Sequence, residues 1–223
     1  MIGAGGQPFE VRAFVWSVER LAWAQANGCP WNERTSACAA GCGRLTELGW
    51  LREHGCPWDA ATCRMAALHG HLAVLQWVRE HDCPWDWQTC ARAAMFGHLA
   101  VLKWARREHG CEWDLETCKA AALGGQLAVL QWARAHHYPW DESTCYNAAA
   151  GGHLAVLQWA RANDCPWDAT TCACAAMGGH LEVLQWARTQ ECPWNSQTCA
   201  AAAAGGHLAV LQWALDHGCP SHV

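Results

Sequence analysis

The chain has 223 residues, and 52% of them are hydrophobic, which suffices to bury a substantial core and excludes a disordered chain. Its formal net charge of -5 and the absence of any run of Lys or Arg argue against nucleic acid or a membrane surface as partner. No stretch approaches the roughly 18 consecutive apolar residues of a membrane span, and the first residues lack a signal-peptide pattern. The cytoplasm or the nucleus is therefore the expected location.

Sixteen cysteines recur in the chain at one spacing and without a secretion signal. Disulfide frameworks are typical of small secreted domains, whereas the cytosol keeps thiols reduced. We therefore expect reduced thiols.

In chain order, the sequence begins with an irregular half-copy in residues 1–28, where SVERLAWAQANG from Ser17 matches the second part of a repeated unit. Seven copies follow in residues 29–218, and they read C-P-W-D-x-x-T-C-x-x-A-A-x-x-G-H-L-x-V-L-Q-W-x-R-x-x-G. Successive copies begin 27 residues apart, with one step of 28, and residues 219–223 begin a further copy. A fixed period of this kind indicates a repeat architecture.

Each copy predicts two short helices, which we describe in the second copy. Asp59 or Thr62 can cap the first helix, because both side chains accept a hydrogen bond from backbone N–H, and Gly70 suits its left-handed end. The segment HLAVLQWVRE, residues 71–80, predicts the second helix, and Gly55 stops the equivalent helix one copy earlier. The apolar face expected for the second helix consists of Leu72, Val74, Leu75 and Trp77.

Helices this short bury too little apolar surface to be stable alone, so each pair must stack on its neighbours. The sequence therefore predicts an all-α fold, an α-solenoid of stacked helix-turn-helix repeats.

The pattern AAxxGHLxVLQW, as in AALHGHLAVLQW of residues 66–77, resembles the ankyrin repeat. The GCPWD segment stands where ankyrins place Gly-Ala-Asp, and the TC dipeptide falls near their Thr-Pro-Leu-His. The ankyrin period is 33, so about six residues are missing between CPWD and TC. The resemblance thus implies ankyrin-like repeats that lack the full β-hairpin finger.

The short, Trp-rich and Cys-rich copies resemble in particular the ankyrin-like repeat proteins encoded by giant DNA viruses and some protists. This resemblance implies a non-enzymatic scaffold for protein–protein interaction. It also implies a viral, host-directed adaptor role in the cytoplasm of the host cell.

A zinc-binding repeat protein is the alternative. His54, Cys56 and Cys63 provide three zinc-type ligands within ten residues, and the next copy repeats this arrangement with His81, Cys83 and Cys90. Other copies lose ligands without replacement, at Ser36, Tyr138, Asn163 and Gln190. A column of small buried thiols tolerates such exchanges better than a tetrahedral site does, so we favour structural cysteines and expect no cofactor.

Catalysis needs one activated group in a special environment, and here every candidate group is copied several times. We therefore expect no enzyme activity. The resemblance implies that the repeated histidine starts the second helix and forms hydrogen bonds between copies, and this column contains His71, His98, His153, His180 and His207.

The residues of the first helix that change most between copies are the candidate partner-binding residues, and random drift is the alternative explanation. The resemblance implies that this helix-one face lines a concave, partner-binding surface, and its Trp, Arg, Tyr and Met are enriched at protein interfaces. The candidate residues are Arg64, Met65, His69, Trp87, Gln88, Arg92, Phe96, Lys119, Tyr146 and Asn147.

The last copy has Ser221 where the other copies place Trp, and it lacks a polar capping repeat. Two interpretations stay open, an apolar C-terminal face that self-associates and a chain that has been cut short.

Overall fold

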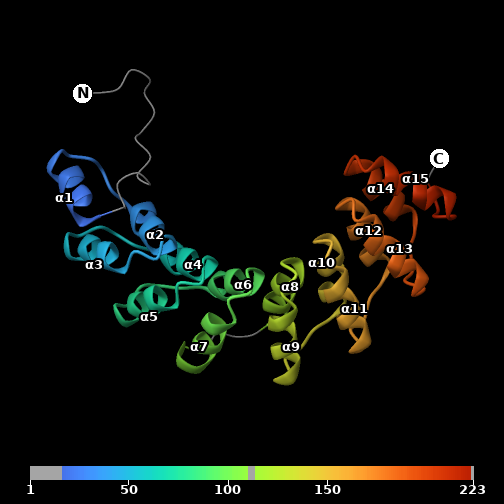
Figure 1. Ribbon diagram of the computed structural model, residues 1–223, viewed down its shortest axis with the longest axis horizontal. Helices are drawn as coiled ribbons and strands as arrows, with labels where there is room; N and C mark the ends of the chain where they lie inside the picture. Colours follow the sequence, from blue (N-terminus) through green and yellow to red (C-terminus); the bar gives the residue numbers. More distant parts are fainter. Residues whose placement is uncertain (1–16, 110–113, 222–223) are drawn as a thin grey trace, which may run out of the picture. The chain divides into compact units, whose positions relative to one another are not determined.

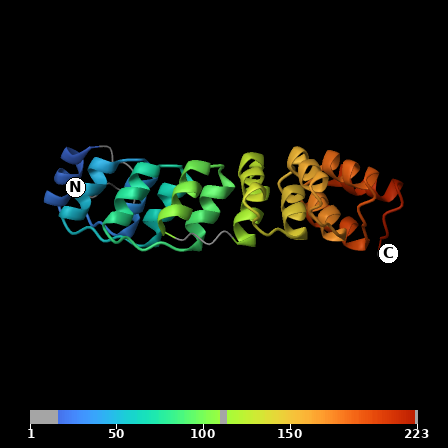
Figure 2. The ribbon, with the colours of Figure 1, turned by 90° about the horizontal axis from the view of Figure 1, so that it is seen from below.

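The computed structural model describes residues 17–109 and 114–221. Within these residues the chain forms fifteen α-helices and no β-strand, which confirms the predicted all-α class without a β-hairpin finger. The helices group into two compact units, unit 1 (residues 1–93) and unit 2 (residues 94–223). Within each unit, successive helix pairs lie side by side as stacked repeats (Figures 1 and 2).

Nearly every helix has nine residues, and the boundary between the two units lies inside α6. The helices that begin in unit 1 are α1 (Val18–Ala26), α2 (Glu33–Gly41), α3 (Leu45–Glu53), α4 (Ala60–Leu68), α5 (Leu72–Glu80) and α6 (Trp87–Met95). The helices of unit 2 are α7 (Leu99–His109), α8 (Leu115–Leu123), α9 (Leu127–Ala135), α10 (Glu142–Ala150), α11 (Leu154–Ala162), α12 (Ala169–Met177), α13 (Leu181–Thr189), α14 (Ser196–Ala204) and α15 (Leu208–Asp216).

Within the units, the first helices of consecutive copies pack against each other, as α2 does on α4 in unit 1 and α12 on α14 in unit 2. The second helix packs on the first helix of its own copy, as α5 does on α4. Each copy therefore contributes one helix to a first-helix layer and one to a second-helix layer, because neither helix can bury its apolar face alone.

An Asp side chain caps the first helix. The Asp59 carboxylate accepts a hydrogen bond from the Ala61 N–H at 2.8 Å, and the Asp59 backbone is extended, as an N-cap requires. Thr62 does not cap, because its side chain is buried inside the helix pair. Asp59, rather than Thr62, is thus the capping residue.

Glycine ends the first helix, as predicted. Gly70 has φ +73°, and the next residue, His71, already provides the N-cap position of α5. Such a φ favours glycine because a Cβ would be crowded there. A link this short forces the second helix to fold back onto the first.

The core of each copy combines alanines from the first helix with aliphatic residues from the second. Ala66 and Ala67 of α4 are fully buried, and so are Leu75 and Val78 of α5. Complete burial of one Leu or Val contributes about 1.5–3 kcal/mol. Of the predicted apolar face of α5, Val74 and Leu75 are buried, whereas Leu72 and Trp77 are only partly buried.

Candidate functional site

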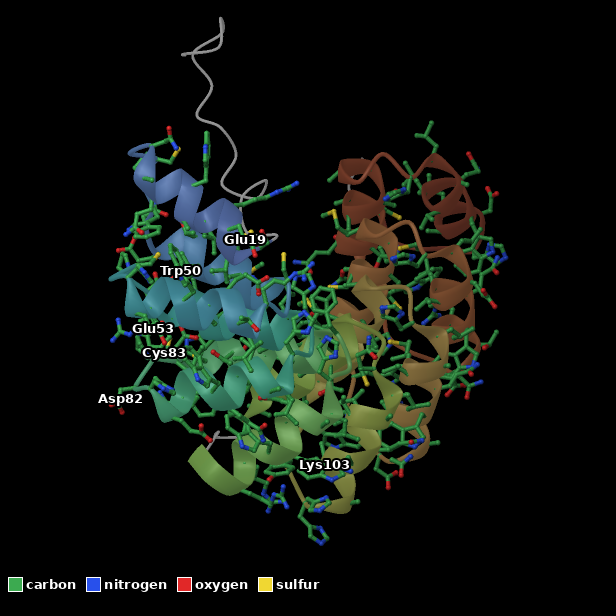
Figure 3. All side chains as sticks on the ribbon, turned by 60° about the vertical axis from the view of Figure 1, so that its left-hand side comes forward. Glu19, Trp50, Glu53, Asp82, Cys83 and Lys103 are labelled. Carbon is green, nitrogen blue, oxygen red and sulfur yellow. The ribbon has the colours of Figure 1, made fainter. Side chains whose placement is uncertain are left out.

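In the copies that begin at Cys56, Cys83, Cys165 and Cys192, the first cysteine links its copy to the preceding one. Cys83 lies in the loop between α5 and α6, and its thiol donates to the carbonyl oxygen of the N-cap residue Asp59 at 3.5 Å. Figure 3 labels Cys83. The same hydrogen bond joins the Cys165 thiol to the Asp141 carbonyl oxygen at 3.3 Å. These thiols are fully buried, so they fill the space between copies and satisfy a cap carbonyl.

The second cysteine of each copy lies on the first helix and is also buried, as Cys63 and Cys118 show. Burial raises the pKa of Cys118 to about 12, because the thiolate is costly to form away from water. Such a thiol stays protonated at neutral pH.

The residues of the zinc alternative do not form one cluster. The exposed His54 ring stacks on Trp50 at 3.9 Å, and its Nδ1 lies 2.8 Å from the Trp50 carbonyl oxygen. His81 makes the same contacts with Trp77 in the next copy. In residues 17–109 and 114–221, no three His, Cys, Asp or Glu side chains gather in a way that could hold a metal ion.

The expectation of reduced thiols holds for most of the proposed ligands but not for one. Cys56, Cys63 and Cys83 are free thiols. Cys90, in contrast, is disulfide-bonded, which also removes it as a zinc ligand. The sequence did not predict this bond. The cysteine spacing within one copy does not show which other sulfur lies near Cys90.

Arginines of the second helices stack on the Trp that follows Cys-Pro, a contact that we did not predict. Arg52 lies over Trp58, with 4.4 Å from Cζ to the ring centroid, and Trp58 packs edge-on against Trp77 at 5.9 Å. Arg161 lies over Trp167 at 4.3 Å and also donates to the carbonyl oxygen of Cys165. A stacked arginine of this type ties the second helix of one copy to the loop of the next.

The Trp that follows Cys-Pro lies at the edge of the core. Trp58 is partly buried, lying between Arg52 and Trp77 rather than inside the helix pairs. The last copy contains the signal that could have revealed this, because it lacks both members of the pair. Leu215 replaces the arginine and Ser221 replaces the tryptophan.

The repeated histidine forms hydrogen bonds between copies, as expected. The Nε2 of His71 lies 3.1 Å from the Gly41 carbonyl oxygen, and Nε2 of His180 lies 3.0 Å from that of Ala150. Both acceptors belong to the end of the first helix in the preceding copy. Because a carbonyl can only accept, Nε2 carries the proton in these contacts.

In unit 1, several candidate partner-binding residues are open to solvent. The Trp87 side chain is 61% exposed, and Arg92 and His69 are exposed as well. Arg64 donates to Asp86 at 2.7 Å, which holds its guanidinium against the neighbouring copy. The remaining two, Met65 and Gln88, are partly buried.

In unit 2, the candidates are more constrained. Phe96 is 50% exposed, whereas Lys119, Tyr146 and Asn147 are partly buried. Lys119 donates to Glu116 at 2.8 Å, and this hydrogen bond raises the pKa of Lys119. The Asn147 amide donates to the Ser143 carbonyl oxygen at 2.8 Å.

Exposed apolar side chains extend this surface in unit 2 beyond the predicted residues. Met177, at the end of α12, is 50% exposed and was not among the candidates. It occupies the same column as Leu123, which is also exposed. The variability of this column, which holds Ala in two other copies of unit 2, is the signal that identifies it.

No helix in the described part of the chain is both long and apolar enough to cross a membrane. The sequence matches no protein-family model and no curated protein. Among solved structures, the chain is similar to the crystal structure of the human ASB11 ankyrin repeat domain. The TM-score is 0.54 and the identity 16%, over 71% of this chain and 84% of that one. Together with the stacked helix pairs, this likeness shows that the chain has an ankyrin-like repeat fold.

Proposed function

We propose that this chain is a non-enzymatic scaffold that binds a partner protein through its helix-one face. One observation supports this most directly: the buried columns repeat with little change, whereas the exposed columns of the first helices differ from copy to copy. Trp87, for example, is largely exposed at a position that holds Ala60 and Ala169 in other copies. Random drift rarely places a large aromatic residue in solvent, and exposed aromatic residues and Arg are typical of binding surfaces.

The repeated polar groups support a scaffold rather than an enzyme. The thiols of Cys63 and Cys83 are buried, and the imidazoles of His71 and His180 form hydrogen bonds to backbone carbonyls. These groups contribute to the stacking of copies. A nucleophile or general base would need access to a substrate and one distinctive environment.

The test compares two exposed tryptophans of unit 1. Trp87 belongs to the proposed surface, whereas Trp23 lies on α1, outside it, with a similar exposed fraction of 57%. The intact chain is first used to capture binding proteins from an extract. The affinity for a captured protein is then compared between the double variant Trp87→Ala with Arg92→Ala, the control Trp23→Ala and the intact chain. We expect the double variant to lose at least about tenfold in affinity, because interface aromatics and arginines dominate binding energy.

Equal retention of the captured protein by all three chains would overturn the proposed surface. Circular dichroism of each variant serves as the folding control. Substitution of an exposed side chain changes the free energy of unfolding by only about 0.5 kcal/mol. Loss of binding by a folded double variant therefore reports on the binding surface itself.

We further propose that the scaffold acts as a viral, host-directed adaptor in the cytoplasm or nucleus of the host cell. The resemblance to the short Trp-rich repeats of giant DNA viruses supports this role. The net charge of -5 supports a protein partner rather than nucleic acid. Imaging of a fluorescent fusion in host cells tests the location, and accumulation at membranes would count against it.

Self-association through the last helix pair is a separate proposal, supported by the apolar residues on α15. Leu208 is 74% exposed and Leu215 is 42% exposed, whereas one copy earlier Leu181 is partly buried and Arg188 stands at the position of Leu215. Sedimentation of the full chain and of Leu208→Glu with Leu215→Glu tests it. A dimer that the variant dissociates would support the proposal, and a monomer at high concentration would refute it.

A further inference from the structure

Pairs of cysteines from consecutive copies place their thiols side by side. In unit 1, Cys63 of α4 lies within hydrogen-bonding reach of Cys83, which precedes α6. In unit 2, Cys145 of α10 points its sulfur at Cys165, 3.9 Å from that residue's carbonyl oxygen. The two further pairs are Cys172 with Cys192 and Cys199 with Cys219.

The four pairs share one geometry. One member lies on the first helix of a copy, the other opens the following copy, and 20 residues separate them, as for Cys145 and Cys165. In two of the pairs the helix-one sulfur lies 3.9 Å and 4.0 Å from the carbonyl oxygen of its partner cysteine, so a bridge of about 2.05 Å between the sulfurs requires the side chains to rotate. Cys90, which has the same helix-one position in the third copy, is already disulfide-bonded.

Two copies interrupt the pattern and provide natural controls. In the first copy Ser36 replaces the helix-one cysteine, and its hydroxyl donates to the sulfur of Cys56 at 3.3 Å. Near Cys118, the position 20 residues further on holds Tyr138 instead of cysteine. Cys56 and Cys118 therefore have the same burial as the paired thiols but no thiol at the partner position.

We propose that these four dithiol pairs are oxidation sites for low-molecular-weight disulfides, and that oxidation covalently joins each first helix to the copy that follows it. The reaction is thiol–disulfide exchange with a disulfide such as oxidised glutathione. One cysteine thiolate attacks the disulfide and releases the first glutathione thiolate, leaving a mixed disulfide. The partner thiolate then attacks the cysteine sulfur of that mixed disulfide and releases the second. Two protein thiols are oxidised, and one disulfide is reduced to two thiols that take up both protons.

Burial controls when this exchange can occur. Cys63 and Cys83 are fully buried, so an oxidant reaches them only when neighbouring copies separate transiently. Within the pair, a hydrogen bond between the two thiols lowers the pKa of Cys83 and raises that of Cys63. The pair therefore forms a single shared thiolate more readily than two, which suits stepwise exchange.

The experiment oxidises the full chain, after complete reduction, with oxidised glutathione in buffer and at urea concentrations below the unfolding transition. Remaining thiols are alkylated, and unreduced peptides are mapped by mass spectrometry. We expect bridges between cysteines 20 residues apart, each lowering the mass by about 2 Da, and alkylated Cys56 and Cys118. The exposed Cys42 reports that the oxidant was active, through its mixed disulfide with glutathione.

A gain-of-bridge variant provides the sharpest control. Ser36→Cys adds a thiol beside Cys56 and should produce one additional bridge and a higher Tm after oxidation, which a reductant reverses. Cys63→Ser reproduces the natural first-copy arrangement and should remove only the bridge to Cys83. Apart from the disulfide of Cys90, bridges that ignore the 20-residue spacing would overturn the proposal, and so would the absence of any bridge in either condition while Cys42 reacts.

Discussion

Unit 1 and the last four copies of unit 2 differ at the residue two positions before the repeated histidine column, whereas Phe96, at the start of unit 2, still has a side chain at this position. In unit 1 this residue is His69 in the second copy, and its side chain is exposed. In unit 2 it is glycine in four successive copies, Gly124, Gly151, Gly178 and Gly205.

The glycines of unit 2 allow backbone to approach backbone. A Cβ built on Gly151 would lie 2.5 Å from the Leu123 carbonyl oxygen, and one on Gly178 would lie 2.8 Å from that of Ala150. Both carbonyls end the first helix of the preceding copy. The last four copies of unit 2 therefore gain close stacking at this position, whereas His69 of unit 1 has a side chain that can contact a partner.

The largest expected effect is on unit 2, from Gly151→Ala. The backbone of Gly151 has φ -82°, which alanine adopts easily, so the cost comes from the new contacts of the Cβ with the Leu123 carbonyl oxygen and the His153 ring. Because a carbonyl of a packed helix cannot move freely, we expect the free energy of unfolding to fall by about 2–3 kcal/mol. Urea denaturation measures it.

The matched control in unit 1 is His69→Ala. It removes an exposed ring and should change the free energy of unfolding by at most about 0.5 kcal/mol. Equal changes in the free energy of unfolding from Gly151→Ala and His69→Ala would contradict our inference that close backbone stacking at Gly151 contributes to stability.

A smaller effect should come from the stacked arginines. Arg161 of unit 2 lies over Trp167 and donates to the Cys165 carbonyl oxygen, so Arg161→Ala should cost about 1–2 kcal/mol. Arg52 of unit 1 is exposed and stacks on Trp58, so Arg52→Ala should cost about half as much. Thermal unfolding of both variants checks this order.

The control is Gln158→Ala, an exposed change on the same helix as Arg161, which should leave Tm unchanged. A decrease in Tm equal to that of Arg161→Ala would contradict the stacking argument.

The sequence was sufficient to predict the features that depend on one copy alone, namely its buried residues and the turn between its two helices. Ala66, Leu75 and Gly70 lie where the helical period and turn chemistry place them, since neighbours in sequence fix their roles. The choice between Asp59 and Thr62 as cap could not be made, because both side chains can accept the same hydrogen bond. Only the helix start, one residue after Asp59, decides it.

Contacts between copies were harder to predict because they depend on how far one pair is shifted against the next. The stacking of Arg52 on Trp58 and the contact of Cys63 with Cys83 both join different copies. A repeat pattern shows that these columns exist but not which columns meet. The candidate partner-binding residues remain a prediction: His69, Trp87, Arg92 and Phe96 are exposed, whereas the other candidates are partly buried.

The smallest expected effect concerns the turn between copies, where each unit has glycine in one copy and a non-glycine residue in another. Gly55 of unit 1 and Gly218 of unit 2 have φ +78° and +81°, whereas Asp82 of unit 1 and Glu191 of unit 2 have φ +60° and +61°. A left-handed backbone costs a non-glycine residue roughly 1–2 kcal/mol. Replacement by glycine removes this strain, but it also stabilises the unfolded chain through glycine's greater conformational freedom, which offsets part of the gain. Glu191→Gly should therefore raise the free energy of unfolding by about 0.5–1 kcal/mol, measured by urea denaturation. Glu191→Asp, which copies the residue at Asp164, should give a smaller gain because Asp tolerates this conformation better than Glu. A loss of stability in both variants would show that the Glu191 side chain contributes more than its backbone strain costs.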